Sequence, residues 1–322
     1  MNEAPKLAGY DAAIGQGPPG QLERVLKSGQ FAITAELPPP DSADPEEVYR
    51  RAEVFAGCVD AINATDGSGA NCHMSSVGVC SLLTRRGYDM IMQMSCRDRN
   101  RIAIQGDVLG GAAMGVNNIL CLTGDGVQVG DEPAAKPVFD LDSVSLLRAV
   151  RMMRDDSRFL TGRPLATPPR VMIGAAINPF VPPQEFQVDK LEKKIEAGAD
   201  FFQTQYCYDL TQFETFMAQV RARELHKRAY ILVGIGVLSS ARSAIWKREH
   251  IPGVHIPDAV VERMSRASDP PAEGARIAVE LLQGLQAMPG IAGVHMMAFK
   301  REDDVADIIE RAGIHAGREA VS

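Results

Sequence analysis

Eight short runs of apolar and β-branched residues recur along the chain, and they constrain its fold more than any other feature. The runs cover residues 31–37, 60–65, 90–96, 118–124, 170–177, 201–207, 229–236 and 293–299. Stretches with helical periodicity separate them, at residues 45–55, 99–114, 143–154, 185–196, 210–223, 257–267 and 272–288. Strands that alternate with helices in this way form a parallel sheet. Eight such strands predict a (β/α)₈ TIM barrel.

An open, doubly wound sheet is the alternative arrangement of the same elements. That fold usually binds a nucleotide through a G-x-G-x-x-G turn after its first strand, and here three prolines follow the first run instead. We therefore predict a single barrel domain over residues 31–315, an N-terminal extension over residues 1–30 and a C-terminal tail over residues 316–322. The polar stretch 124–140 predicts a long loop, and long loops in compact domains are commonly functional.

The composition restricts the class of ligand. The 322 residues include 41 acidic and 34 basic side chains, for a formal net charge of −7, which argues against nucleic acid and an anionic membrane surface as partners. The six cysteines form no C-x-x-C pair, and the first residues have neither the basic nor the apolar region of a signal peptide. We expect a cytoplasmic protein with a small-molecule ligand, and both a monomer and a homo-oligomer remain open.

Polar side chains close several of the runs, at the strand ends where (β/α)₈ barrels place their chemistry. Glu36 closes the first run and could act as a general acid or pair with a Lys or Arg. Asp125, flanked by two glycines, could meet a planar ligand or belong to a simple turn. Gln203 and Gln205 share one face of the sixth run and need partners, either a ligand or each other.

Several other classes of site lack their motifs. The histidines are scattered and only His73 adjoins a cysteine, so the sequence predicts no metal site. There is no G-x-S-x-G turn and no Walker loop, which disfavours acyl transfer and nucleotide hydrolysis.

Three motifs, in this order, resemble the methylenetetrahydrofolate reductase family. Residues 31–39 resemble its first strand, E-[FL]-x-P-P, residues 122–125 its L-R-G-D, and residues 197–206 its A-G-A-[DN]-x-x-x-T-Q-x. The resemblance runs from Phe31 to about Gly313 and is nearest to the bacterial members. It implies an FAD-dependent barrel enzyme that interconverts 5,10-methylenetetrahydrofolate and 5-methyltetrahydrofolate by hydride transfer at flavin N5.

The same resemblance implies roles for individual residues. Glu36 falls on the catalytic glutamate that supplies a proton to N10 of the folate, and Asp125 falls on an aspartate whose charge stabilises the cationic iminium. Gln205 and Arg301 fall on folate-contacting residues, and Arg301 faces the glutamate tail. The residues implied to bind FAD are Thr65, Gln93, Thr123, Gly124, Asp125, Phe139, Asp142, Ala175 and Lys194.

Three departures from the family pattern bear on the cofactor and the electron donor. Thr123 replaces the arginine of L-R-G-D, and Arg97 and Arg99 are the candidates to replace its contact with the flavin cofactor. Gln187 stands where the family has an aspartate on the adenosine ribose. Ala241 stands where NADH-using members have a phenylalanine, which removes an aromatic contact of about 0.5–1.5 kcal/mol. We therefore expect NAD(P)H to be a poor donor.

Two consequences and two alternatives follow. Poor use of NAD(P)H would imply a redox partner protein or operation in the oxidative direction, unless a nearby ring such as Trp246 replaces the missing one. A flavin-independent, pterin-binding methyltransferase barrel would need many of the same polar strand ends. A noncatalytic folate- or flavin-binding subunit would not need the acid at Glu36.

Overall fold

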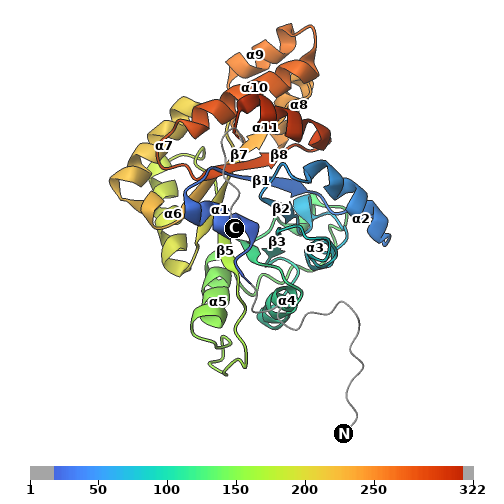
Figure 1. Ribbon diagram of the computed structural model, residues 1–322, viewed down its shortest axis with the longest axis vertical. Helices are drawn as coiled ribbons and strands as arrows, with labels where there is room; N and C mark the ends of the chain where they lie inside the picture. Colours follow the sequence, from blue (N-terminus) through green and yellow to red (C-terminus); the bar gives the residue numbers. More distant parts are fainter. Residues whose placement is uncertain (1–17, 315–322) are drawn as a thin grey trace.

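The computed structural model describes residues 18–314, whose strands pair in sequence order into a closed parallel barrel (Figure 1). Each of the eight expected runs forms a strand, so the (β/α)₈ prediction is confirmed. The strands are β1 (Ala32–Leu37), β2 (Ala61–Ala64), β3 (Met90–Ser95), β4 (Asn118–Leu122), β5 (Met172–Ile177), β6 (Phe201–Tyr206), β7 (Tyr230–Gly236) and β8 (Gly293–Met297).

Helices surround the ring of strands (Figure 1). The periodicity of the sequence predicts seven of them, but it does not predict α1, α3, α8 or α11. In α8, Ala244 is the buried residue and no apolar stripe marks the helix. The helices are α1 (Gln21–Ser28), α2 (Pro45–Ala52), α3 (Ser76–Thr84), α4 (Arg101–Ala113), α5 (Ser143–Asp155), α6 (Gln184–Ala197), α7 (Leu210–Ala222), α8 (Ala241–His250), α9 (Asp258–Arg266), α10 (Pro270–Gln286) and α11 (Val305–Ala312).

Short polar side chains start several of these helices. Asn100 accepts hydrogen bonds from two backbone N–H groups of α4, and Asp142 forms a capping box at the start of α5. Ser240 accepts from Ser243 N at the start of α8. Each cap satisfies an N–H group that the first helical turn leaves without a partner.

Helix α1 closes the amino-terminal end of the barrel, and Figure 1 shows it across the centre of the ring. Its Leu22, Val25 and Leu26 are buried. They pack with inward-facing side chains of β1 to β7, namely Ala32, Ala61, Ile91, Leu120, Met172, Phe201 and Leu232. The extension predicted over residues 1–30 therefore contains a helix that belongs to the barrel core. Residues 1–17 and the predicted tail 316–322 lie outside the described residues.

Asp89 anchors the start of α1. Its carboxylate accepts a hydrogen bond from Leu22 N at 2.8 Å and another from Asn118 Nδ2 at 2.9 Å. Burial raises the pKa of Asp89 to about 6, against the opposing effect of these two donors. A carboxylate at the first turn of a helix also complements the positive end of the helix dipole.

The opposite end of the barrel carries the loops that follow the strands. The longest is the expected loop after β4, which extends from residue 123 to residue 142 and contains a short 3₁₀ turn, Val127–Val129. Within residues 18–314, no helix is both long enough and apolar enough to cross a membrane.

We expect Leu22→Ala to lower the free energy of unfolding by about 2–5 kcal/mol, because it leaves a cavity between α1 and the strands. The matched control is Ile102→Ala, since the Ile102 side chain is 77% exposed and its loss should change stability by less than about 0.5 kcal/mol. Urea unfolding followed by circular dichroism measures both. Equal midpoints for the two variants would contradict the assignment of α1 to the core.

Candidate functional site

Glu36 lies at the carboxyl end of β1, at the mouth of the barrel. Its neighbour in the parallel register is Asn63 of β2, and its Oε2 lies 3.8 Å from Nε2 of His295 on β8. The Glu36 side chain is 27% exposed, whereas that of His295 is 3% exposed. One carboxylate oxygen therefore faces the buried imidazole while the group stays accessible from the mouth.

Beside Glu36, four buried polar side chains form one hydrogen-bonded network. Asn63 and Gln203 pair through both amides: Asn63 Nδ2 donates to Gln203 Oε1 at 2.6 Å, and Gln203 Nε2 donates to Asn63 Oδ1 at 3.0 Å. Gln203 Nε2 also lies 3.1 Å from Thr34 Oγ1 and 3.3 Å from His295 Nδ1. Thr34 Oγ1 lies 3.0 Å from the same ring nitrogen. The network ties β1, β2, β6 and β8 together and holds the His295 ring in place.

The network favours one tautomer of His295. An amide N–H can only donate, so the approach of Gln203 Nε2 favours an unprotonated Nδ1 that accepts. The proton of the neutral ring is then on Nε2, which faces Glu36. This N–H faces Glu36 Oε2 from 3.8 Å, and the other carboxylate oxygen does not face the ring.

Two further side chains share the electrostatic surroundings of Glu36. Lys247 of α8 places its ammonium group 4.8 Å from the ring centroid of Tyr206 on β6. Burial lowers the pKa of Lys247, and the negative charge of Glu36 acts in the opposite direction. Burial, followed by the charge of Glu36, raises the pKa of Tyr206. Glu36 therefore faces a neutral phenol and a cation as well as an imidazole.

Gln205 lies in an irregular stretch of β6. The pairing of β6 with β7 shifts register between Gln203 and Tyr206. Within that irregularity Gln205 Oε1 accepts a hydrogen bond from Tyr206 N at 3.0 Å, and Thr204 Oγ1 accepts one from Gly234 N at 2.9 Å. Bulges re-aim side chains in this way. Gln203 therefore joins the interior network, while Gln205 folds back on its own backbone.

Two buried hydroxyl groups follow β2 and end β3 without a partner. Thr65 Oγ1 and Ser95 Oγ form no hydrogen bond with any described residue between 18 and 314. Gly124 adjoins Ser95, because a Cβ added there would lie 3.1 Å from Ser95 Oγ and from Arg97 Cβ, and its φ is +93°. Buried hydroxyls without partners are costly unless a ligand or water supplies one. This side of the mouth therefore offers two hydrogen-bonding hydroxyl groups to a ligand.

The loop after β4 brings other predicted cofactor residues together. Thr123 Oγ1 accepts a hydrogen bond from Ser143 N at 3.1 Å, which places Thr123 next to Asp142 at the start of α5. Asp125 is exposed at the mouth. Gln93 is 7% exposed and Ala175 is fully buried.

Two more of these residues contact neighbouring strands. Phe139, which has a φ of +40°, donates its N–H to Cys96 O at 3.2 Å, so the loop folds back over the end of β3. Lys194 of α6 donates to Ala176 O at the end of β5 at 2.7 Å, and burial lowers the pKa of its ammonium group. Lys194 thus reaches the mouth at β5 instead of extending into solvent.

The two arginines considered as substitutes at position 123 are both paired with carboxylates. Arg97 donates to Asp98 and to Gly67 O at 3.0 Å. Arg99 donates to both oxygens of Asp66, at 2.6 and 3.0 Å, and to Asp107. Arg97 adjoins Gly124 and is the nearer of the two to the Gly124–Asp125 turn.

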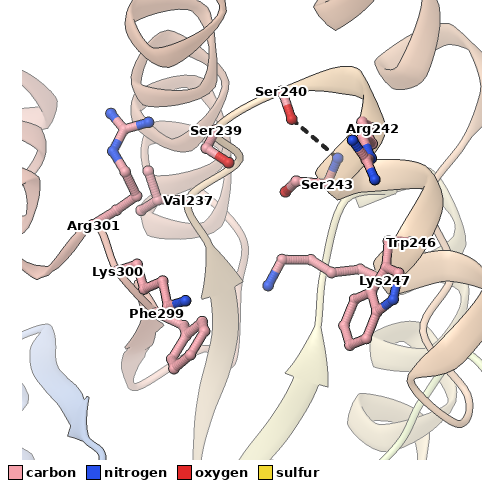
Figure 2. Close-up of a pocket in the computed structure, with 10 residues that line it drawn as sticks. All are labelled: Val237, Ser239, Ser240, Arg242, Ser243, Trp246, Lys247, Phe299, Lys300 and Arg301. Carbon is pink, nitrogen blue, oxygen red and sulfur yellow. Dashed lines mark hydrogen bonds between the residues drawn. The ribbon is translucent and has the colours of Figure 1, made fainter.

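A recess of about 360 Å³ lies between α8 and the loop after β8. Figure 2 shows the Lys247 side chain extending into it from α8, with the rings of Trp246 and Phe299 on either side. The lining residues are Val237, Ser239, Ser240, Arg242, Ser243, Trp246, Lys247, Phe299, Lys300 and Arg301.

Arg301 lines this recess but is held by the protein. Its guanidinium bonds to the carboxylate of Asp304 and donates to Leu238 O at 3.4 Å and Pro271 O at 3.2 Å. In Figure 2 the group points away from the Lys247 amine. The predicted contact between Arg301 and a substrate tail would require these bonds to be exchanged.

Sequence reasoning did not single out Thr34, Asn63, Lys247 or His295. Thr34, Asn63 and His295 are fully or almost fully buried polar residues in otherwise apolar strands, and that pattern is the signal that could have found them. Lys247 carries no such local signal. In the part of the chain that the structure describes, no three His, Cys, Asp or Glu side chains are grouped to hold a metal ion.

Two curated proteins are similar to this chain over most of its length. Methylenetetrahydrofolate reductase 1 of Schizosaccharomyces pombe is 26% identical over 307 residues, which cover 92% of this chain and 47% of that protein. A probable methylenetetrahydrofolate reductase (NADPH) of Caenorhabditis elegans is 25% identical over 312 residues, which cover 91% of this chain and 44% of that protein. The chain thus spans about half the length of these curated relatives.

Among solved structures, an uncharacterized protein from Clostridium thermocellum that binds two copies of 5-methyl-5,6,7,8-tetrahydrofolic acid has a TM-score of 0.63 to this chain. The identity is 12%, over 90% of this chain and 99% of that one, so the likeness shows a shared fold. A family model described as Methylenetetrahydrofolate reductase matches residues 21–313, from the start of α1 to the end of α11. With all eight strands inside that match, the chain belongs to the methylenetetrahydrofolate reductase family.

Proposed function

We propose that this protein interconverts 5,10-methylenetetrahydrofolate and 5-methyltetrahydrofolate with FAD as cofactor, and that Glu36 is its general acid and base. The observation that carries the proposal is the position of Glu36 at the mouth, 3.8 Å from a buried imidazole. Family membership supports the reaction class. The curated relatives are about twice as long, so the proposal assigns this chemistry to the barrel alone.

Glu36 holds the proton that N10 of the folate receives when its five-membered ring opens, and it takes the proton back in the reverse direction. Nε2 of His295 lies 3.8 Å from Oε2, which leaves Oε1 as the oxygen that does not face the ring. Asp125, exposed at the mouth, contributes the negative charge that stabilises a cationic iminium of the substrate. Gln205 and Arg301 contact the folate after giving up their present bonds.

FAD, when bound, supplies the hydride-transfer chemistry of the reaction. The hydroxyls of Thr65 and Ser95 offer hydrogen-bonding groups that have no partner in the described residues, and Gly124 lets the backbone approach a flat ring. The residues that we assign to this cofactor are Thr65, Gln93, Thr123, Gly124, Asp125, Phe139, Asp142, Ala175 and Lys194.

Our inference about the electron donor rests on the small side chain at position 241. Ala241 is the first residue of α8 and packs against the core, so it offers no ring to a nicotinamide. Trp246 lies on the same helix but stacks on His250, with ring centroids 5.0 Å apart. We propose that NAD(P)H is a poor electron donor for this enzyme. Either a redox partner protein supplies the electrons, or the enzyme works in the oxidative direction.

The protein is expected to purify with noncovalent FAD that denaturation releases. Thr65→Val should weaken FAD binding by about 2- to 12-fold, because one hydrogen bond of about 0.5–1.5 kcal/mol is lost. It should not lower the melting temperature of the apoprotein, since the hydroxyl has no protein partner. Thr84→Val is the matched control: it removes another buried hydroxyl without a partner, in α3. A colourless protein that FAD cannot reconstitute would contradict the cofactor assignment.

Glu36→Gln keeps the shape of the side chain but cannot deliver a proton to the folate. Folate turnover should fall by about 10²–10⁴-fold, the range typical of general acid–base groups. The flavin content, measured by absorbance after denaturation, should not change. Normal turnover would remove Glu36 from the mechanism, and loss of flavin would give it a structural role instead.

Reduction of the bound flavin should be fast with 5-methyltetrahydrofolate and slow with NADH or NADPH. Hydride transfer requires that nicotinamide C4 be held within about 3–3.5 Å of flavin N5. Without an aromatic side chain to stack on, the nicotinamide occupies this position less often. Anaerobic stopped-flow absorbance compares the donors directly. Ala241→Phe should accelerate reduction by NADH, and equally rapid bleaching of the unaltered protein by NADH would show that the substitution is compensated.

A further inference from the structure

Four large apolar side chains are exposed on one side of the barrel mouth. Ile102 lies at the start of α4, and Val129, Val138 and Phe139 belong to the loop after β4. Ile102 is 77% exposed and Val129 is 65% exposed. Single exposed apolar side chains are ordinary, but several that adjoin one another commonly mark a surface that binds another molecule.

Three of these side chains are held next to one another by the loop. Arg101, which precedes Ile102, donates a hydrogen bond to Asp140, which follows Phe139, at 2.8 Å. The same part of the loop runs along the end of β3, where Val138 N donates to a backbone carbonyl at 2.7 Å. Ile102, Val138 and Phe139 therefore form one apolar strip across the start of α4.

Val129 extends this strip toward the loop after β2. The residue that follows it, Gly130, packs so closely on that loop that an added Cβ would lie 1.9 Å from Ala70 O. Arg97 at the end of β3 donates to Gly67 O of the same loop at 3.0 Å. A recess of about 260 Å³ lies between the loops after β2 and β4. We call the strip and this recess the β4-loop face.

The β4-loop face is negatively charged. The loop from residue 123 to residue 142 has five carboxylates and one cation, Lys136. Arg101 neutralises Asp140, but Asp131 and Glu132 are exposed and form no ion pair with any residue between 18 and 314. Four carboxylates and two arginines line the recess. Because charges across an interface are complementary, an occupant of this face is positively charged.

The charge also distinguishes between possible occupants. A second copy of this chain in a symmetric contact would bring the same negative face against itself, and like charges disfavour that contact. An anionic membrane surface is disfavoured for the same reason. A basic protein meets neither objection, and apolar side chains with a charged rim are typical of protein interfaces.

The β4-loop face adjoins the part of the mouth where we place the cofactor. Gly124 belongs to the same loop, and a Cβ added there would lie 3.1 Å from Ser95 Oγ and 3.1 Å from Arg97 Cβ. Arg97 is also the residue whose carbonyl accepts the hydrogen bond from Val138 N. A protein bound to the face therefore lies beside the proposed flavin site.

On the basis of the proposed function, we infer that the β4-loop face docks the redox partner of this enzyme, an electron-carrier protein with a basic surface. Ile102 and Val129 supply apolar contacts, and Glu132 attracts the basic groups of the carrier. In the oxidative direction, two one-electron carriers are reduced for each 5-methyltetrahydrofolate that is oxidised to 5,10-methylenetetrahydrofolate, and two protons are released to water. Weak electron-transfer complexes have small interfaces, of less than about 1,200 Å² in total, which suits a face with four apolar side chains.

The test uses the flavin-loaded protein, 5-methyltetrahydrofolate as the donor and cytochrome c as the probe. Cytochrome c is a small basic haem protein that accepts one electron per molecule. Succinylated cytochrome c has the same haem but a negative surface, and ferricyanide is an acceptor that needs no docking face. We expect a higher kcat/KM for native than for succinylated cytochrome c, measured by haem absorbance. Because the attraction is between exposed charges, this advantage should shrink as the salt concentration rises.

Glu132→Gln should lower kcat/KM for native cytochrome c by about 1.5- to 5-fold, the value of one exposed ion pair. Glu310→Gln is the matched control, because Glu310 is exposed near the end of α11, across the ring of strands from α4 (Figure 1). Both variants should keep the unaltered rate with ferricyanide.

Ile102→Ser and Val129→Ser should each lower kcat/KM for cytochrome c as well, because they remove apolar area from the contact. Phe186→Ser is the matched control, since Phe186 is an exposed apolar residue on α6. The rate with ferricyanide should again stay unchanged. Equal kcat/KM for native and succinylated cytochrome c, or variants of the face that behave like their controls, would overturn the inference.

Failure of the inference can be told apart from failure of the proposed function. If 5-methyltetrahydrofolate supports ferricyanide reduction but the two forms of cytochrome c react equally, the reaction stands and the docking face is wrong. If 5-methyltetrahydrofolate does not reduce the flavin, dithionite can reduce it instead. A preference for native cytochrome c that depends on Glu132 would then support the docking face, while the proposed reaction would be wrong.

Discussion

The pairing of β8 with β1 closes the barrel, and the arrangement of the mouth depends on it. Thr34 and His295 are 261 positions apart in the chain, yet their side chains lie 3.0 Å apart. The closure demands a glycine: a Cβ at Gly293 would lie 2.2 Å from Ala32 O. Any larger residue there would push the two strands apart and separate Glu36 from His295. The close backbone contact at Gly293 thus fixes the position of Glu36 relative to His295.

Burying polar side chains inside the barrel costs free energy unless each of them forms hydrogen bonds. The protein supplies these hydrogen bonds at one place in the mouth but not at another. Asn63, Gln203, Thr34 and His295 satisfy one another across four strands, so their burial leaves a rigid support for Glu36. The hydroxyls at Thr65 and Ser95 have no such partner. Groups that a protein buries without satisfying them are commonly those that a ligand completes. This difference distinguishes the part of the mouth where protein groups satisfy all the hydrogen bonds from the part where we place the cofactor.

The two sides of the mouth also differ in their net charge. On the side of β2 and β3, Arg97 and Arg99 are neutralised by Asp98, Asp66 and Asp107. On the side of α8, Arg242, Lys247 and Lys300 of the recess pair with no carboxylate at salt-bridge distance among residues 18–314, and Lys247 extends this charge to Glu36. On the first side, the arginines pair with carboxylates and leave little net positive charge.

The sequence by itself determined the elements and several of the strand-end residues. Local hydrophobic periodicity specifies eight strands, and the prolines after β1 place Glu36 at a strand end, because both depend only on neighbours along the chain. The tertiary structure decided which groups these side chains contact. The register shift in β6 turned Gln205 onto its own backbone, and Asp304 with two distant carbonyls took Arg301. Helix α8, which has no apolar stripe, brought Lys247 to the mouth. The pairing of β6 with β7, the two carbonyls that hold Arg301 and the contact of Lys247 with Tyr206 join residues far apart in the chain, so no local pattern encodes them.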